Sequence, residues 1–175
     1  MNSALFLDRD GVVNIDHGYV YKKSNFDFTE NIFDLVRSAN NLGYLVVIIT
    51  NQAGIARGYY TEKDFNVLTL WMHEQFKLKG AKIDKTYFCP FHKDGVIKKY
   101  KKDSYLRKPN PGMIQNACKE LDIDPSKSLL VGDKETDIEA GLASGIPKCI
   151  YFGKNECNIA FKSTYDLNSI ESELV

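Results

Sequence analysis

Acidic residues gather at points where apolar runs of the sequence end. Asp8 and Asp10 follow one such run, and Asp133 follows another, with Asp137 one helical turn later. Two bare carboxylates about 4 Å apart repel by roughly 4 kcal/mol at an effective dielectric constant near 20, so several in one place need a cation. Mg²⁺ fits, because it uses few protein carboxylates and shares the rest of its shell with water and phosphate. The pattern therefore indicates a site for a hard divalent cation.

Basic and uncharged polar residues add to this pattern. Thr50 and Asn51 close a further apolar run, and Arg107 and Lys108 could meet the anionic side of a substrate. Each feature alone has an ordinary explanation, because Asp-x-Asp-Gly and Thr-Asn are common turn compositions, an Asp suits a helix start, and lysines are usually solvated. The ordinary explanations do not account for the succession of these features at one strand end after another.

Several other chemistries lack their residues. The sequence contains neither Gly-x-Ser-x-Gly nor Gly-x-x-x-x-Gly-Lys-Ser/Thr, which excludes the serine-hydrolase elbow and the P-loop. An EF-hand is excluded too, because Val13 stands where its glycine is required and Tyr19 where its bidentate glutamate belongs.

The elements that must position these residues follow an alternating pattern. Short aliphatic runs alternate with stretches of helical period, which is typical of a parallel sheet with crossover helices. We predict an α/β fold with a doubly wound sheet, in which ligands bind at the carboxyl ends of the strands. The predicted strands are Ala4–Leu7, Leu45–Thr50, Ile83–Phe88, Ser128–Val131 and Lys148–Tyr151.

Helices are predicted between these strands. Apolar residues at helical spacing span 32–42, and a capping-box-like Thr61–Asp64 precedes a second stripe over 65–76. Asn110 is expected to cap a third helix that Pro111 opens, and a fourth covers Glu135–Ser144. The segments left over, 8–31 and 89–110, are long for a compact domain, and such loops tend to be functional.

Composition narrows the class of protein. A chain of 175 residues predicts one domain over 1–175. Lys+Arg and Asp+Glu number 23 each, so the net charge of zero gives no electrostatic basis for binding nucleic acid. No apolar run reaches the roughly 18 residues of a membrane span and no signal peptide is evident, so a cytoplasmic protein without membrane partners is expected. Cysteines without a Cys-x-x-Cys pair fit free thiols, and the lack of a coiled coil favours a monomer.

Taken in order, the motifs resemble those of the haloacid dehalogenase (HAD) superfamily of phosphatases. Asp8–Val13 matches the first motif, Thr50–Asn51 the second, Lys108 the third and Gly132–Asp137 the fourth. The resemblance covers most of the chain. It implies a Rossmann-like sheet without a large cap domain, and a phosphatase that requires Mg²⁺.

Longer strings carry a narrower resemblance. Asn14–Val20, Thr50–Gly58 and Arg107–Gly112 are similar to members that remove the 7-phosphate of D-glycero-D-manno-heptose 1,7-bisphosphate. This implies a small sugar bisphosphate as substrate, in the biosynthesis of nucleotide-activated heptose. Histidinol-phosphate phosphatases share the general motifs and are the nearest alternative.

The resemblance also implies roles for individual residues. Asp8 would be the nucleophile that forms an aspartyl-phosphate, and Asp10 the general acid and then the base. Mg²⁺ would lie between Asp8, the carbonyl oxygen of Asp10 and Asp133, while Thr50 and Lys108 neutralise phosphate charge.

Substrate recognition is expected from neighbouring residues. Arg107, with its rigid fork, would suit the second phosphate, and Lys134 and Asp137 would orient Asp8 and the metal shell. The expected substrate-binding set is Asp16, His17, Gly18, Tyr19, Thr50, Asn51, Gln52, Ala53, Arg107, Lys108 and Lys134.

One departure from the resembled members concerns zinc. They often carry a zinc loop before the Arg-Lys-Pro, built on Cys-x-His and Cys-x-Cys. Here Cys89 remains and His92 lies near it, but the other three ligand positions hold Phe91, Ser104 and Leu106. A closed structural site takes four ligands, so no zinc is expected. Apolar packing of the loop is expected instead, by Phe88, Phe91, Tyr100, Tyr105 and Leu106.

Two alternatives without enzymatic activity remain. A phospho-accepting receiver domain also places acids, Thr and Lys at strand ends, but its acceptor Asp follows the third strand, which here ends in Tyr87-Phe88-Cys89. A binding relative without activity is disfavoured by the presence of both Asp8 and Asp10.

Overall fold

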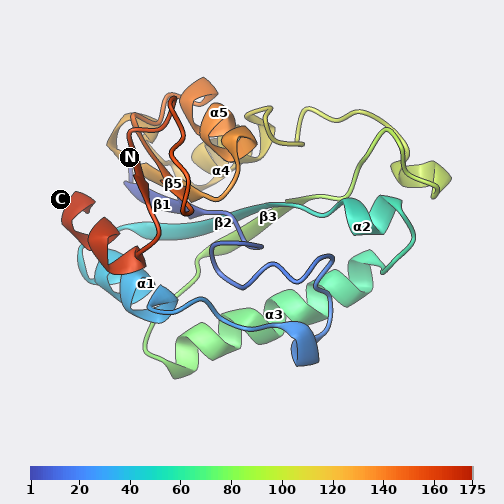
Figure 1. Cartoon of the computed structure of the whole chain (residues 1–175), viewed down its shortest axis with the longest axis horizontal. Helices are drawn as coiled ribbons and strands as arrows, with labels where there is room; N and C mark the ends of the chain where they lie inside the picture. The colour runs from blue at the N-terminus through green and yellow to red at the C-terminus, as the bar shows by residue number, and fades with distance from the viewer. Residues whose placement is uncertain (175) are drawn as a thin grey trace.

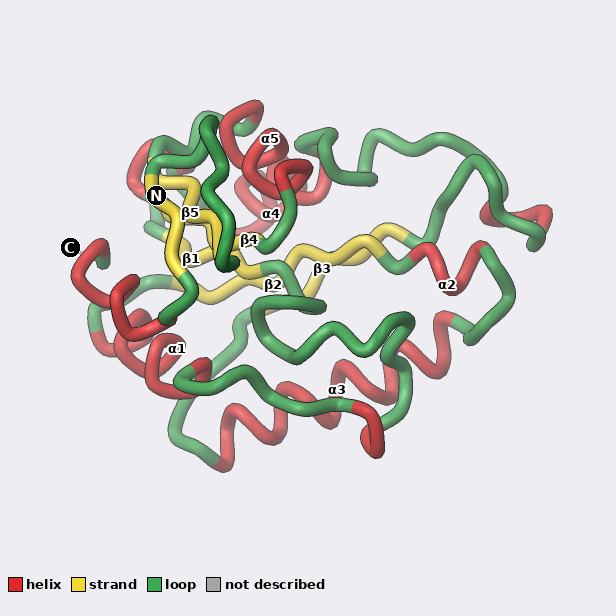
Figure 2. The backbone as a smooth tube through the Cα atoms, viewed as in Figure 1, coloured by secondary structure: helices red, strands yellow, loops and turns green. Residues whose placement is uncertain are grey.

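The computed structural model describes residues 1–174 and has an α/β architecture (Figures 1 and 2). The strands are β1 (Ala4–Leu7), β2 (Leu45–Asn51), β3 (Lys85–Cys89), β4 (Leu129–Gly132), β5 (Lys148–Phe152) and β6 (Lys162–Thr164). The α-helices are α1 (Ile32–Asn41), α2 (Ala53–Ala56), α3 (Glu62–Leu78), α4 (Gly112–Leu121) and α5 (Glu135–Ala143). None of these helices is long and apolar enough to cross a membrane.

All six strands form one sheet in the order β3-β2-β1-β4-β5-β6, and every neighbouring pair is parallel. The first strand lies in the interior of the sheet, where Leu5 pairs with Val46 of β2 on one side and with Leu129 of β4 on the other. The crossovers place α1 and α3 on one face and α4 and α5 on the other (Figure 1). The predicted doubly wound sheet is therefore confirmed.

Both faces of the sheet are buried, which explains why its strands read as continuous apolar runs. Because side chains alternate along a strand, Leu5 and Leu7 enter one apolar layer while Ala4 and Phe6 enter the other. The first layer includes Phe76 of α3, and the second includes residues of α4 and α5. These two layers hold β1 rigidly, so the residue that follows it has a fixed position.

The predicted N-cap of α3 is confirmed, and the predicted N-cap of α4 is wrong. The predicted capping box of α3 is present, because Thr61 Oγ1 accepts from the Asp64 N–H and Asp64 Oδ2 accepts from the Thr61 N–H. The predicted cap of α4 is wrong: Pro111 occupies the N-cap position and the helix begins at Gly112. The Asn110 amide instead donates to the Ser104 carbonyl oxygen at 3.3 Å, so it serves the preceding loop.

The segment between β3 and α4 extends past α2 and returns (Figure 2). Most of its expected packing is present. Phe91 and Leu106 pack against the apolar layer that contains α4, and Phe88 and Tyr100 pack against a smaller cluster beside α3. The expectation for Tyr105 is wrong, since this side chain is 59% exposed.

Candidate active site

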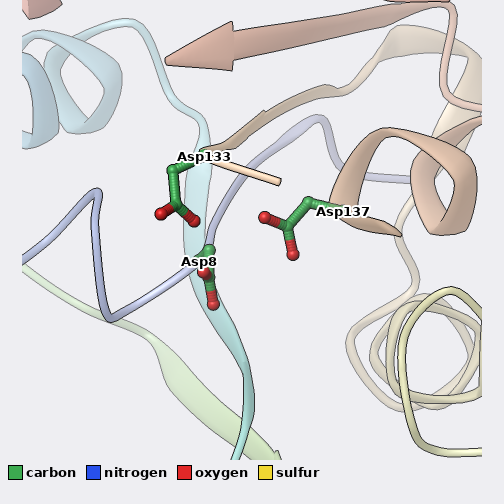
Figure 3. Close-up of side chains that lie close together, drawn as sticks. All are labelled: Asp8, Asp133 and Asp137. Carbon is green, nitrogen blue, oxygen red and sulfur yellow. The ribbon is translucent and has the colours of Figure 1, made fainter. Parts of the chain in front are cut away.

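Three carboxylates meet at the carboxyl edge of the sheet (Figure 3). Asp8 directly follows β1, Asp133 follows β4, and Asp137 comes from the first turn of α5. The Asp8 N–H donates to the Val131 carbonyl oxygen, which continues the pairing of the two strands as far as the site. One oxygen of each carboxylate lies within 4.8 Å of the others. The structure therefore brings together carboxylates that are far apart in sequence.

A single buried lysine bridges two of these acids. Lys108 Nζ lies 2.7 Å from Asp8 Oδ1, 2.6 Å from Asp137 Oδ1 and 3.0 Å from the Ile49 carbonyl oxygen. Burial acts to lower the pKa of Lys108, but Asp8 and Asp137 more than offset it and raise the pKa above its ordinary value. Lys108 is therefore charged, and its three N–H donors are all engaged.

The acids outnumber this lysine, and their pKa values reflect it. Burial raises the pKa of Asp8, and Asp137 raises it further, while Lys108 acts in the opposite direction. Burial and then Asp137 also raise the pKa of Asp133. The cluster thus holds more negative charge than its buried cation neutralises, which favours a further cation.

The side-chain oxygens of Asp133 and Asp137 differ in how they are used. Asp137 Oδ1 contacts Lys108, and its Oδ2 accepts from the backbone N–H of Lys134, so this residue is committed to holding α5 and the lysine. Asp133 Oδ1, by contrast, is buried and has no hydrogen-bond partner in residues 1–174. A buried carboxylate oxygen without a donor suits a hard oxygen-seeking ion such as Mg²⁺. The donor set therefore fits the predicted metal.

Gly11 lets the first loop pass close to this acid. Its φ of +96° is in the region that favours glycine, and a Cβ there would lie 2.1 Å from Asp133 Oδ2. Any side chain at position 11 would displace the Asp133 carboxylate.

Asp10 lies apart from this cluster, in a separate set of hydrogen bonds. Its Oδ1 accepts from Arg9 Nη2 at 2.9 Å and from Asn14 Nδ2 at 3.1 Å, and its Oδ2 accepts from Gln52 Nε2 at 3.1 Å. Arg9 is 1% exposed, with the rings of Phe26 and Phe65 beside its guanidinium. Arg9 was not expected at the site, because an arginine between two acids ordinarily indicates a solvated charge.

Asn51 and Thr50, at the end of β2, form hydrogen bonds with Lys108 and Gln52. Asn51 makes two hydrogen bonds with the backbone of Lys108, one to its carbonyl oxygen and one from its N–H. Thr50 is 1% exposed, and its Oγ1 accepts from Gln52 Nε2 at 2.8 Å. The strand end thus fixes the segment that carries the lysine.

A pocket of about 450 Å³ opens beside these groups. It is lined by twelve of the residues expected at the site: Asp8, Asp10, Asp16, Gly18, Tyr19, Asn51, Gln52, Ala53, Arg107, Lys108, Lys134 and Asp137. Tyr60 and Thr136 also line it and were not expected. A tyrosine in a loop carries no periodic signal, so only the fold could reveal its position.

Some expected residues do not line the pocket. Thr50 and Asp133 are not among its lining residues, although Asp133 belongs to the carboxylate cluster. His17 points elsewhere: its Nε2 lies 2.7 Å from Asp27 Oδ2, and its side chain is 47% exposed. The neighbouring loop is shaped instead by Asp16, whose Oδ1 accepts from the Gly18 N–H.

Arg107 lines the pocket with a guanidinium that has no carboxylate partner among the ion pairs of residues 1–174. Its Nη1 is buried and has no hydrogen-bond partner within the same residues. Lys134 carries a weaker contact, with Nζ 4.0 Å from Asp16 Oδ2 on the exposed side of the pocket. Arg107 is thus available to an anion.

Cys89, the last residue of β3, is the one expected zinc-ligand position that keeps its residue type. Its thiol donates weakly to the Phe91 carbonyl oxygen at 3.8 Å, and burial raises its pKa. A raised pKa disfavours the thiolate that binds metal. The expectation that this segment binds no zinc stays a prediction.

Comparisons with known proteins agree with this site. Residues 105–153 match the HAD-hydrolase-like family model. The D-glycero-alpha-D-manno-heptose-1,7-bisphosphate 7-phosphatase of Burkholderia mallei is 54% identical over 145 residues, which cover 83% of this chain and 77% of that protein. A HAD-like phosphatase of Mesorhizobium loti superposes with a TM-score of 0.90 at 32% identity, over 99% of this chain and 86% of the other.

A second solved structure extends the likeness in fold. The D,D-heptose 1,7-bisphosphate phosphatase of B. bronchiseptica, solved with magnesium and phosphate, has a TM-score of 0.82 at 24% identity, over 98% of this chain and 97% of the other. The long match to the Burkholderia mallei enzyme and the acidic edge of the sheet lead to one conclusion: this chain belongs to the heptose-1,7-bisphosphate 7-phosphatase family of the HAD superfamily.

Proposed function

We propose that this protein is a phosphatase that removes the 7-phosphate from D-glycero-D-manno-heptose 1,7-bisphosphate. The observation that carries the proposal is the carboxylate cluster at the edge of a pocket that also presents Arg107, which has no carboxylate partner within residues 1–174. One anionic group of the substrate would meet the cluster and its cation, and the other would meet the guanidinium. The Burkholderia mallei relative is named as a phosphatase of a sugar with two phosphates, which fits two separate anion-binding points.

Asp8 would act as the nucleophile. Its oxygen would bond to phosphorus while the bond from phosphorus to the leaving sugar oxygen breaks, which gives an aspartyl-phosphate. Asp10 would give a proton to the leaving oxygen and later take one from the attacking water. Lys108 would hold Asp8 in line and neutralise charge on the phosphoryl oxygens.

Mg²⁺ would be held by Asp8, Asp133 and the carbonyl oxygen of Asp10. When bound, it would offset the negative charge of the phosphoryl group beside the carboxylates. Asp137 would keep Lys108 in place rather than bind the metal, because its oxygens contact Lys108 and the Lys134 N–H.

Substrate selection would depend on the loops around the pocket. Arg107 would bind the second phosphate with its fork of N–H donors. Tyr19, Gly18 and Asp16 would border the sugar from the first loop, and Asn51, Gln52 and Ala53 from the end of β2. We further propose that the chain is a single domain, acts as a monomer and resides in the cytoplasm.

The test is phosphate release in the presence of Mg²⁺ from both anomers of heptose 1,7-bisphosphate, with histidinol phosphate as the competing substrate. We expect release from the heptose bisphosphate and at least tenfold less from histidinol phosphate. An Arg107→Met variant should raise KM for the bisphosphate more than for p-nitrophenyl phosphate, which has no second phosphate. Preferred turnover of histidinol phosphate would contradict the proposal.

A further inference from the structure

One buried amide links two groups of the site. Gln52 is 3% exposed. Its Nε2 donates to Asp10 Oδ2 at 3.1 Å and to Thr50 Oγ1 at 2.8 Å. Both N–H donors of the amide are therefore in use. If the amide rotated by half a turn, its carbonyl oxygen would face the Asp10 carboxylate and repel it.

Tyr60 determines which way this amide faces. Its hydroxyl donates to Gln52 Oε1, so the carbonyl end of the amide is held away from Asp10. The hydroxyl stays protonated, because burial raises the pKa of Tyr60. Packing fixes the ring independently: Tyr21 stacks on it with centroids 5.1 Å apart, and a Cβ on Gly54 would lie 2.2 Å from its Cε1.

The two oxygens of Asp10 are held unequally. Oδ1 accepts from both Arg9 and Asn14, whereas Oδ2 accepts from Gln52. When Asp10 gives its proton to the leaving oxygen, the carboxylate that remains is stabilised by these donors. The donor on Oδ2 is correctly aimed only while the Gln52 amide keeps its orientation.

We propose that Tyr60 is a positioning residue for the phosphatase reaction: through Gln52 it holds Asp10 in the orientation for proton transfer to the leaving sugar oxygen. This inference rests on the proposed function, because it assigns that proton transfer to Asp10. It also gives Gln52, which lines the pocket, a second role in the support of Asp10.

A Tyr60→Phe variant tests the proposal, since it removes the hydroxyl and keeps the packed ring. The readout is kcat/KM for two leaving groups, the sugar of heptose 1,7-bisphosphate and the nitrophenolate of p-nitrophenyl phosphate. Nitrophenolate leaves without a proton, so its kcat/KM, which covers the steps up to leaving-group departure, does not need Asp10 as acid. We expect kcat/KM to fall about tenfold or more for the sugar substrate and less than about twofold for the aryl substrate.

The matched control is Tyr21→Phe, which removes the hydroxyl of the stacked ring and should change neither value. Gln52→Ala is a second variant that removes the amide itself, and it should reproduce the selective loss. Adding Tyr60→Phe to Gln52→Ala should cost nothing further, because the two residues act through one path.

Equal losses for both leaving groups in Tyr60→Phe, or additive losses in the double variant, would overturn the proposal. A wild-type protein that hydrolyses another primary sugar phosphate but not the heptose bisphosphate would instead overturn the proposed function. The same comparison of leaving groups would then test Tyr60 with that sugar phosphate.

Discussion

Carboxylates behave in opposite ways in two regions of the molecule. At the carboxyl edge of the sheet, burial raises the pKa of Asp8 and of Asp133. At the start of α3, hydrogen bonds from Thr61 lower the pKa of Asp64. At the start of the short 3₁₀ helix Pro125–Lys127, one from the Ser126 hydroxyl lowers the pKa of Asp124. Ionised carboxylates therefore stabilise the fold at the helix starts and destabilise it at the sheet edge. The edge is arranged for a ligand, and the packed layers beneath it keep it in place.

Replacing the proposed nucleophile should lower activity and raise stability, and so show that the sheet edge is arranged for a ligand and not for stability. Asp8→Asn should lower phosphate release by roughly 10⁴–10⁶-fold, as for other enzymes that lose a nucleophile. The same variant should unfold at a higher temperature than wild type without metal, because it removes one buried negative charge. Activity assays and thermal melts in EDTA measure the two effects.

The gain in stability should also depend on pH. A carboxyl group whose pKa is raised on folding binds its proton more tightly in the folded state, so wild type recovers stability as the pH falls through that raised value. The advantage of Asp8→Asn should therefore shrink as the pH is lowered from neutral toward 4. A variant that is less stable than wild type at neutral pH would contradict this view of the edge.

Removing the buried lysine should have the largest effect on stability. Lys108→Met leaves Asp8 and Asp137 without their shared cation and should cost about 3–5 kcal/mol of unfolding free energy. Lys85→Met is the matched control, because Lys85 pairs with Glu120 at the surface and such pairs contribute about 0–1 kcal/mol. Urea denaturation at pH 7 measures both, and similar losses would mean that burial does not distinguish the two regions.

Bound metal should stabilise the edge, and the gain should rise with the logarithm of the Mg²⁺ concentration above Kd. Mg²⁺ at 100 times its Kd should add about 2.7 kcal/mol to the unfolding free energy of wild type. Asp133→Asn should abolish most of this response, since Asp133 Oδ1 is a buried carboxylate oxygen that accepts no hydrogen bond within the described part of the chain. Asp124→Asn, at a helix start, should retain the response. Thermal melts across a Mg²⁺ titration distinguish them.

The smallest expected effect lies at the start of α3. Thr61→Ala removes the cap and should cost about 1 kcal/mol at pH 7. The lowered pKa of Asp64 contributes stability above its unfolded value near 3.9, and this is lost as the pH falls through the folded value. The variant should lose less stability than wild type over this acid range. Denaturation curves between pH 2 and pH 7 provide the measurement.

The sequence predicted the features that have a strong local or periodic signal. The apolar runs located β1 to β5 to within two residues at every end, and Thr61 and Asp64 predicted the cap of α3. The edge strand β6 was not predicted, because its three residues, Lys-Ser-Thr, are half-buried and form no apolar run. The α2 helix is only four residues long, which is too short for a helical period.

At the site, residue type predicted the charged groups. It did not predict that Asp10 has hydrogen-bond partners separate from those of the carboxylate cluster. Asp8, Asp133, Asp137 and Lys108 were expected together and lie together. The separate support of Asp10 could not be predicted, because it depends on partners brought in by the fold, such as the buried Arg9. A side chain that is charged and yet buried has no signature in a single sequence.

The interior position of β1 has a consequence for synthesis of the chain. Its partner β2 is complete at Asn51, but its other partner, β4, begins at Leu129, so roughly 80 residues must be added before the second edge of β1 can pair. At about 5–20 residues per second this leaves an apolar strand with an open edge for roughly 4–16 s. Such an edge is a template for aggregation, so the nascent chain should depend on protection by the ribosome or a chaperone over this interval.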